Sequence, residues 1–228
     1  MEDENLHIEP GLVNGAKIAL SYATAAGAAG IGVKFALEAL RERGLPSFVA
    51  RTAIASLATL ISFQLLPHAP VGVSEVHFIF GSTLFLLFGA APAALGLALG
   101  LLAQGLLFAQ IDLPQYGMNV TTLLVPLFAI KLVADRIIPR GTAYADVSYK
   151  QALALSTTYQ AGVVAWVGFW VTYGQGLAIT PEVMTFGAAY LMVIAIEPLV
   201  DLAVLAGAKT IKGLEHSGLV SDRTLKAA

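Results

Sequence analysis

The sequence has 228 residues, of which 57% are hydrophobic and 12% are charged, and its mean hydropathy is +0.77. An average soluble domain carries about 25% charged residues, so this chain has too few charges to cover a water-facing surface of its size. The formal net charge of −2 excludes a strongly basic nucleic-acid-binding protein, and the lack of cysteine excludes disulfides, zinc ribbons and thiol catalysis. We therefore expect an integral membrane protein.

The N-terminal segment, residues 1–11, is acidic, whereas a cleavable signal peptide begins with basic residues. Its carboxylates are Glu2, Asp3, Glu4 and Glu9. We therefore expect no cleaved signal peptide. The membrane-spanning helices themselves are expected to direct insertion into the cell (inner) membrane.

Long charge-free stretches predict the helices. A membrane-spanning helix needs about 20 predominantly apolar residues, because the hydrocarbon core of a bilayer is roughly 30 Å thick. Asp, Glu, Lys and Arg are missing from residues 52–74, 76–111, 113–130 and 151–181. We predict an all-α, polytopic helix bundle over residues 12–207, within a single transmembrane domain that takes in residues 1–228. About seven helices are expected, near residues 12–36, 48–66, 77–90, 92–110, 118–138, 150–174 and 183–207. The third is short, and its fusion with the fourth around Gly89 to Pro92 is an open alternative.

The basic residues predict the orientation of the bundle, since Lys and Arg stay on the cytoplasmic side of a membrane. They flank the first and fifth predicted loops and occupy the C-terminal tail: Arg41, Arg43, Arg51, Arg136, Arg140, Lys150, Lys209, Lys212, Arg223 and Lys226. The second, fourth and sixth loops contain none, and only Lys17 falls near the opposite face. We therefore predict that residues 1–11 lie outside the cell and that residues 208–228 form a cytoplasmic tail.

This orientation gathers polar side chains on the outer side. His7, His68 and His77 fall in outward-facing segments, together with Asp112 and Asn119. Three imidazoles on one side of a bundle indicate a cation or metal site, because neutral imidazole suits Co, Ni, Cu and Zn. A solvated or capping histidine is the alternative for any one of them.

Small residues recur at helical spacing in the first and fourth predicted helices. They are Ala19, Ala23, Gly27 and Gly30 in the first, and Gly96, Gly100 and Gly105 in the fourth. Small residues let helix backbones approach closely in lipid. These stripes therefore indicate packing faces, either against a neighbouring helix or against a partner subunit.

Two carboxylates, Glu197 and Asp201, share one face of the last predicted helix at i, i+4 spacing. Ionisable groups inside a membrane are expensive and indicate a functional role by default. Pro198 and the nearby cytoplasmic end also permit a structural role, in which both carboxylates snorkel or pair near the interface. Lys131 and Asp135 are likewise i, i+4 neighbours, and we expect a structural ion pair there.

Motifs of soluble enzymes are missing from the sequence. It contains no HExxH helix, no GxxxxGK[ST] loop and no GxSxG elbow. We therefore expect a protein that is not an enzyme, and any ATP-driven role would need a separate ATPase subunit.

Three segments carry a family resemblance. His7 to Gly11, which reads His-Ile-Glu-Pro-Gly, resembles the Met-His-Ile-Pro-x-Gly start of the cobalt/nickel substrate-binding subunits of energy-coupling factor transporters, the CbiM/NikM family. Pro70 to His77 is similar to that family's Pro-x-Pro-Gly-Thr-Ser-x-His loop. Gln104 to Phe108, followed by Gly117 to Val120, resembles its Gln-x-Leu-x-Phe and Gly-Ala-Asn-x elements.

The resemblance implies a site for a transported divalent ion. In such proteins a planar set of nitrogens holds the ion: the terminal amine, the amide nitrogen and imidazole of the second residue, and a loop histidine. Carried over to this sequence, His7 and His77 would supply the imidazoles and Asn119 would support the site. A planar nitrogen set suits Ni(II) and related geometry accepts Co(II). The resemblance also implies ATPase subunits and a transmembrane coupling subunit, which Ala19 and Ala23 would contact.

Two departures from the family pattern carry hypotheses of their own. Six residues precede His7, so the Met1 amine does not stand where the family has its terminal-amine ligand, one residue before the histidine. Translation that begins at Leu6, from an alternative start codon, would give Met-His-Ile-Glu-Pro-Gly and would restore the terminal nitrogen. In the loop, Glu75 and Val76 stand where the family has small residues, and Glu75 either adds an oxygen ligand or faces water.

We interpret the sequence as the substrate-capture subunit of an energy-coupling factor ABC transporter that imports divalent cobalt or nickel, with His68 and Glu75 as supporting residues. One alternative is the same architecture binding a non-metal, vitamin-like solute. Another is a secondary transporter that uses Glu197 and Asp201 and works without ATPase partners.

Overall fold

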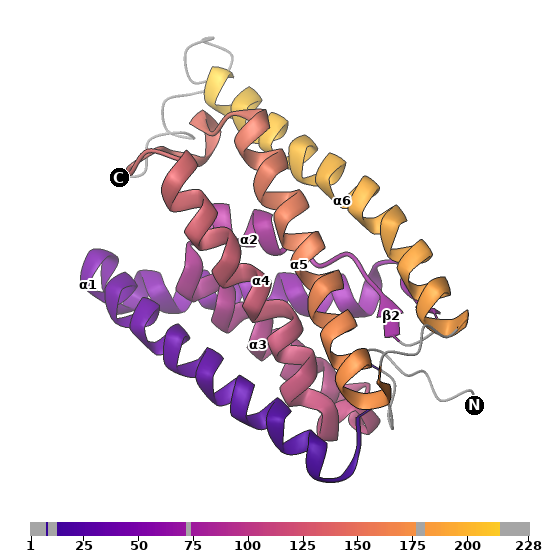
Figure 1. Ribbon diagram of the computed structural model, residues 1–228. Coiled ribbons are helices and arrows are strands. Elements are labelled where there is room, and N and C mark those ends of the chain that lie inside the picture. Colours follow the sequence, from indigo (N-terminus) through magenta and orange to yellow (C-terminus); the bar gives the residue numbers. More distant parts are fainter. Residues whose placement is uncertain (1–7, 9–12, 72–73, 177–180, 215–228) are drawn as a thin grey trace.

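The computed structural model describes residue 8 and residues 13–71, 74–176 and 181–214, and Figure 1 shows the arrangement of its helices. The helices are α1 (Ile18–Leu65), α2 (Gly81–Phe88), α3 (Ala90–Leu107), α4 (Tyr116–Ile137), α5 (Tyr149–Gln175) and α6 (Pro181–Leu214). Short 3-10 turns lie at Gly15–Lys17, Gln110–Gln115 and Tyr144–Asp146, and two short strands are β1 (Ala69–Val71) and β2 (Ser74–Val76). The predicted helical architecture is confirmed, and the small hairpin is an addition to it.

Four helical segments of the described chain are long and apolar enough to cross a bilayer. They are Gly15–Leu65, Ala90–Leu107, Gln110–Ile137 and Val183–Lys212. A membrane core demands such segments, because a helix satisfies its own backbone hydrogen bonds there. The composition and the structure therefore agree on a membrane protein.

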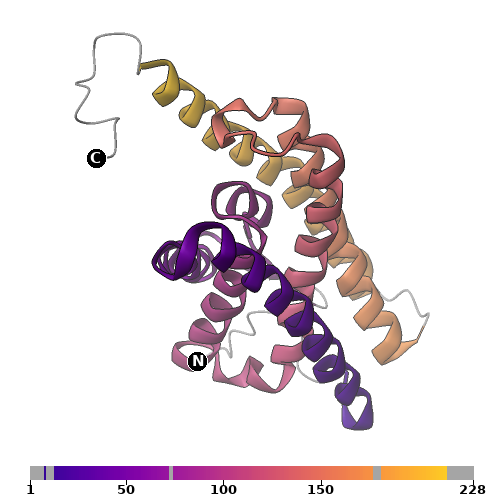
Figure 2. The ribbon, with the colours of Figure 1, turned by 90° about the vertical axis from the view of Figure 1, so that its left-hand side faces the viewer.

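Helix α1 contains the first two predicted helices, joined at a sharp bend. Gly44 has φ 72° and ψ 171°, outside the helical region, and Pro46 follows inside the helix. A backbone with this φ favours glycine, and proline lacks the N–H that an unbroken helix would use. We call residues 18–43 the first arm and residues 45–65 the second arm; Figures 1 and 2 show the two arms running in different directions.

The second arm packs closely against α3. A Cβ atom on Gly96 would lie 2.3 Å from the Cβ of Ala55, and one on Gly100 would lie 2.6 Å from the Cβ of Thr59. Nothing larger than hydrogen fits at these crossings, so the small residues of α3 serve packing within this chain. On the first arm, a Cβ on Gly27 would meet no atom within 4 Å among the described residues.

Helix α2 is shorter than the helix predicted at 77–90. It begins at Gly81 and has 8 residues, a rise of about 12 Å. Gly89, with φ 87°, separates it from α3, so the two helices do not fuse. Residues 77–80 are a non-helical segment instead, and this segment becomes important at the site.

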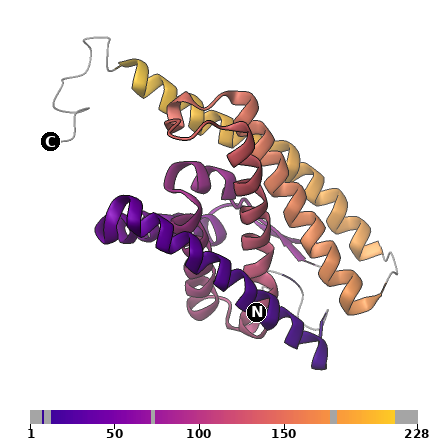
Figure 3. The same ribbon diagram turned by 60° about the vertical axis from the view of Figure 1, so that its left-hand side comes forward.

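Helices α4, α5 and α6 lie side by side, as Figure 3 shows. The N-cap Ser148 starts α5 with a capping box, since its hydroxyl accepts from the Gln151 N–H while the Gln151 side chain accepts from the Ser148 N–H. Helix α6 continues to Leu214, so residues 208–214, which we predicted as the start of the tail, are helical.

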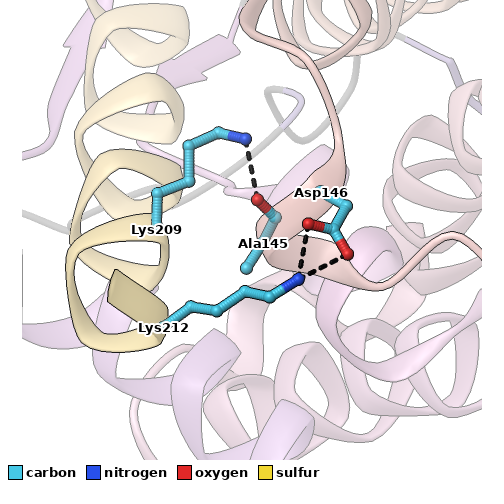
Figure 4. Close-up of polar contacts among 4 residues, drawn as sticks. All are labelled: Ala145, Asp146, Lys209 and Lys212. Atoms are coloured by element: carbon cyan, nitrogen blue, oxygen red, sulfur yellow. Dashed lines mark hydrogen bonds and ion pairs between the residues drawn. The ribbon is translucent and has the colours of Figure 1, made fainter. Parts of the chain in front are cut away.

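Basic residues at the C-terminal end of α6 hold the loop before α5. Lys209 donates to the carbonyl oxygen of Ala145 at 2.7 Å, and Lys212 pairs with the Asp146 carboxylate at 2.6 Å (Figure 4). The hydrogen bond from Lys212 lowers the pKa of Asp146. The structural ion pair predicted between Lys131 and Asp135 is confirmed at 2.5 Å.

Lys17, the exception in the charge pattern, has a specific partner at the other end of α5. Its ammonium group donates to the carbonyl oxygens of Tyr173 at 3.1 Å and Gly174 at 3.0 Å. The last carbonyls of a helix lack intrahelical donors and carry the negative end of its dipole. A cation in the first turn of this chain therefore caps the end of α5.

Candidate metal-binding site

The β1–β2 hairpin brings His68 and His77 together. In its antiparallel register Ala69 pairs with Val76, so the residues that flank this pair, His68 and His77, lie across from each other. Their ring centroids are 5.8 Å apart. The sequence predicted that both lie on one side of the bundle; the hairpin makes them neighbours.

His77 is buried and lines a cavity of about 40 Å³, which we call the His77 cavity. Its ring also packs against the ring of Phe63, with 5.1 Å between centroids. The cavity walls are mostly apolar and come from α1, α3, α4, α5, α6 and the hairpin region: Ile8, Phe63, Ser74, His77, Ile79, Leu101, Asn119, Thr122, Leu123, Val163, Val167 and Tyr190. A water molecule needs roughly 10–15 Å³ of such space, so the cavity has room for a largely dehydrated ion.

Asn119 holds Ile8 at this cavity. Its Oδ1 accepts a hydrogen bond of 3.4 Å from the backbone N–H of Ile8, which is 2% exposed. The Nδ2 of Asn119 is buried and has no hydrogen-bond partner among the described residues. His7 and Leu6, predicted as ligands, lie outside the described residues; the residue that follows them is anchored in the cavity wall.

The family model described as cobalt uptake substrate-specific transmembrane region, CbiM, matches residues 7–213. The chain belongs to this family. The resemblance seen in three segments of the sequence is thereby confirmed and extends through α6. No curated protein and no solved structure matches the chain. As a CbiM-family member, the protein is a membrane component of cobalt uptake.

The described part of this CbiM-family chain holds no group of three or more His, Cys, Asp and Glu side chains that could bind a metal. Asp112 is buried on the turn at Gln110–Gln115 and does not line the His77 cavity. Glu75 pairs through its backbone with Pro70 in the hairpin, and its side chain lies outside the described atoms. His68 and His77 are the imidazoles that the described structure brings together.

His77 also faces a second, more open space. A groove of about 280 Å³ is lined by His77, His68, Met192 and neighbouring apolar residues of the hairpin and α6. The Nδ1 of His68 lies 2.9 Å from the carbonyl oxygen of Leu66. Because a carbonyl only accepts, this contact puts the proton of a neutral His68 on Nδ1 and the lone pair on Nε2.

The carboxylates of α6 are buried and do not snorkel, and neither forms an ion pair with another described residue, so the structural role considered for them in the sequence is corrected here. Glu197 is 0% exposed and accepts hydrogen bonds of 2.8 Å from the backbone N–H groups of Ile79 and Phe80. Gln160 of α5 donates a third. Asp201 is also buried and accepts from the hydroxyl groups of Ser82, Thr83 and Ser156. Glu197 therefore binds the backbone of residues 79 and 80, shortly after His77, whereas Asp201 binds hydroxyl groups in the first turn of α2 and on α5.

Proposed function

We propose that this protein is the membrane-embedded substrate-capture subunit of an energy-coupling factor ABC transporter that imports divalent cobalt or nickel. One observation carries the proposal. The imidazole of His77, the amide of Asn119 and Ile8, the residue after His7, are all buried and all line the same cavity. The protein binds the ion and does no covalent chemistry.

His77 and His7 are the proposed imidazole ligands. Nitrogen donors suit Ni(II) and Co(II), and a mostly apolar wall keeps water from competing for the ion. The bond from Ile8 to Asn119 supports this assignment, since it fixes Ile8, the residue that follows His7 in the chain, next to the cavity. Asn119 thus acts as a support rather than as a ligand.

The terminal nitrogen is the third element of the proposed site. If translation begins at Leu6 as methionine, an amine and the amide nitrogen of His7 complete a planar set. Mass spectrometry of the intact protein decides this point: a stable chain that retains residues 1–5 removes the amine from the ligand set.

His68 and Glu75 are proposed as supporting residues at the mouth of the site. The short distance between the two rings would let the His68 imidazole approach an ion on its way to His77. Glu75 lies on the adjacent strand, where its negative charge would attract cations.

We further propose that the His77 cavity faces the outside and that the basic end of α6 faces the cytoplasm. The positive-inside rule supports this orientation. Lys209 and Lys212 lie near the C-terminal end of α6, whereas Tyr190, which lines the cavity, lies in its N-terminal part. Import would follow from a rigid-body reorientation driven by the ATPase partners, with the ion bound more tightly in one state than in the other.

The coupling subunit is the proposed partner of the first arm. Ala19 and Ala23 are exposed there, at a spacing that lets another helix approach closely in lipid. The described contacts of this chain leave that face uncovered, which supports a contact between subunits.

The size of the cavity favours an ion over an organic solute. Sites for drug-sized molecules measure roughly 300–1,000 Å³, whereas the His77 cavity measures about 40 Å³. A secondary transporter based on Glu197 and Asp201 is disfavoured as well, because both carboxylates already accept hydrogen bonds from neighbouring groups.

The test is metal binding by the purified protein, measured by calorimetric titration with NiCl2 and CoCl2. His77→Ala and His7→Ala should each abolish detectable binding while the helical content and the membrane insertion stay unchanged. His216→Ala, in the predicted tail, is the matched control and should bind as the wild type does. Wild-type affinity in both site variants would contradict the assignment.

A further inference from the structure

We propose that Glu197 is a positioning residue of the metal site: it fixes the backbone after His77 and so holds the His77 imidazole at the cavity. This inference rests on the proposed function and adds a residue that touches no ion. Glu197 does not line the His77 cavity, whereas Ile79, whose N–H it binds, does.

The segment 77–80 needs an external acceptor. It lies between β2 and α2, so neither the hairpin nor a helix supplies a carbonyl for the N–H groups of Ile79 and Phe80. Both N–H groups donate to Glu197 instead, one to each carboxylate oxygen, at 2.8 Å. Unsatisfied backbone donors are costly in an apolar interior, so this carboxylate determines where the segment can lie.

The backbone conformation of Phe80 also indicates that its surroundings fix this segment. Its φ of 55° and ψ of 27° lie in the left-handed region, and it is the described non-glycine residue with a positive φ. A bulky residue keeps such a conformation only where its surroundings fix it, and strained residues of this kind cluster at binding sites. The bond from the Phe80 N–H to Glu197 is one of the interactions that fix it.

Glu197, with the backbone N–H groups of Ile79 and Phe80 that it binds, forms what we call the Glu197 clamp, and Gln160 links this clamp to α5. Its side-chain amide donates to the same Glu197 oxygen that accepts from Phe80. Three N–H donors from two separate parts of the chain thus converge on one carboxylate of α6, an arrangement that suits an acceptor-only group. Because α5 and α6 also supply Val163, Val167 and Tyr190 to the cavity wall, the clamp ties the ligand loop to that wall.

Asp201, one helical turn away, provides a matched comparison. It is equally buried in the same helix, but its donors are three hydroxyl groups, at residues 82, 83 and 156. A hydroxyl can rotate to accept a hydrogen bond from an asparagine amide, whereas a backbone N–H cannot accept one. In Glu197→Gln the new amide group would face a backbone N–H, so two donors would oppose each other. In Asp201→Asn the new amide group can donate to a hydroxyl oxygen, so a carboxylate is removed from α6 without such a conflict.

The experiment compares Glu197→Gln with Asp201→Asn in the full-length protein in detergent. Nickel affinity is measured by calorimetric titration with NiCl2, and the thermal stability of the metal-free protein is measured in parallel. Removal of a group that orients a metal ligand typically costs 10- to 100-fold in affinity. We expect a loss of about that size for Glu197→Gln and a change of less than about threefold for Asp201→Asn.

A spectroscopic readout separates positioning from general stability. Electron paramagnetic resonance of the Cu²⁺-loaded protein reports the nitrogen ligands through their hyperfine couplings. Glu197→Gln should alter this pattern, because a displaced His77 ring changes the ligand set, whereas Asp201→Asn should keep the wild-type spectrum. A wild-type affinity and spectrum in Glu197→Gln would overturn the proposal, and so would equal losses in both variants.

Two further outcomes are decisive. If Glu197→Gln does not accumulate as folded protein, Gln160→Leu replaces it, since this change removes one donor and leaves α6 intact; unchanged nickel affinity in that variant would overturn the positioning role. If the wild type binds neither Ni²⁺ nor Co²⁺, the proposed function itself fails, and this result is distinct from a wild type that binds while Glu197→Gln binds equally well.

Discussion

The two arms of α1 both contain many small residues but have different surroundings. The second arm meets α3 so closely that Gly96 and Gly100 have no room for a side chain. The first arm touches α4 closely where Gly117 faces Ser21, yet a Cβ added to Gly27 or Gly30 would meet no atom of a neighbouring described element within 4 Å. The spacing of small residues thus predicts close approach but does not reveal the partner. In α1, small residues pack against other helices of this chain at some positions and form an exposed face at others.

The largest loss of stability is expected where α3 crosses the second arm. In Gly100→Leu the new side chain would start 2.6 Å from the Cβ of Thr59 and 2.8 Å from the carbonyl oxygen of Ser56. Overpacking of a close crossing costs 1–3 kcal/mol and occasionally more, and we expect about 3 kcal/mol or more here. Thermal unfolding in detergent measures it. The same substitution at Gly27 is the control, and equal stability of the two variants would break the comparison between the arms.

A smaller effect is expected at the bend itself. Gly44→Ala places a side chain on a backbone with φ 72° and ψ 171°, a region that is essentially restricted to glycine. We expect a destabilisation of roughly 1–3 kcal/mol. Gly30→Ala, in the regular helix of the first arm, should instead be neutral or slightly stabilising, because alanine is the better helix former by about 1 kcal/mol. A Gly44→Ala protein as stable as the wild type would show that the bend does not depend on this conformation.

The smallest effect on stability is expected on the first arm. Gly27→Leu and Ala23→Leu should change the free energy of unfolding by no more than about 0.5 kcal/mol and should leave nickel affinity unchanged. If this face binds the coupling subunit, both variants should lose at least about tenfold in association, which corresponds to 1.4 kcal/mol. Co-purification with the coupling and ATPase subunits, together with uptake of radiolabelled cobalt, measures this loss. Leu191→Phe, at an exposed position of α6, should leave both readouts unchanged, and normal uptake in the first-arm variants would place the partner elsewhere.

The helical membrane architecture could be predicted from the sequence because its causes are local. Charge-free stretches predict helices directly, and the helices predicted at 118–138 and 150–174 match α4 and α5 within two residues at each end. Residues 37–47 lie between the first two predicted helices and contain Gly44 and Pro46. These residues do interrupt the helix, but only through a bend.

The hairpin and the clamp could not be predicted, because their causes are not local. The strands at 69–71 and 74–76 are short, and no alternation of apolar and polar residues marks them. Glu197 and Asp201 stand out as charges in an apolar helix, but their donors lie 117 to 119 positions earlier in the chain, apart from those on α5. Backbone N–H groups leave no pattern in a sequence. The sequence therefore identified the unusual residues of α6 without showing what they bind.

The contact made by Lys17 has a mechanical meaning. The lysine stands at the start of the first arm and grips the last turn of α5, at Tyr173 and Gly174, while α5 contributes Val163 and Val167 to the wall of the His77 cavity. If the first arm tilts, those two hydrogen bonds must either break or draw α5 along with it. A movement of the first arm, caused by a partner bound to its exposed face, would thus be transmitted through Lys17 and α5 to the wall of the cavity that is proposed to hold the ion.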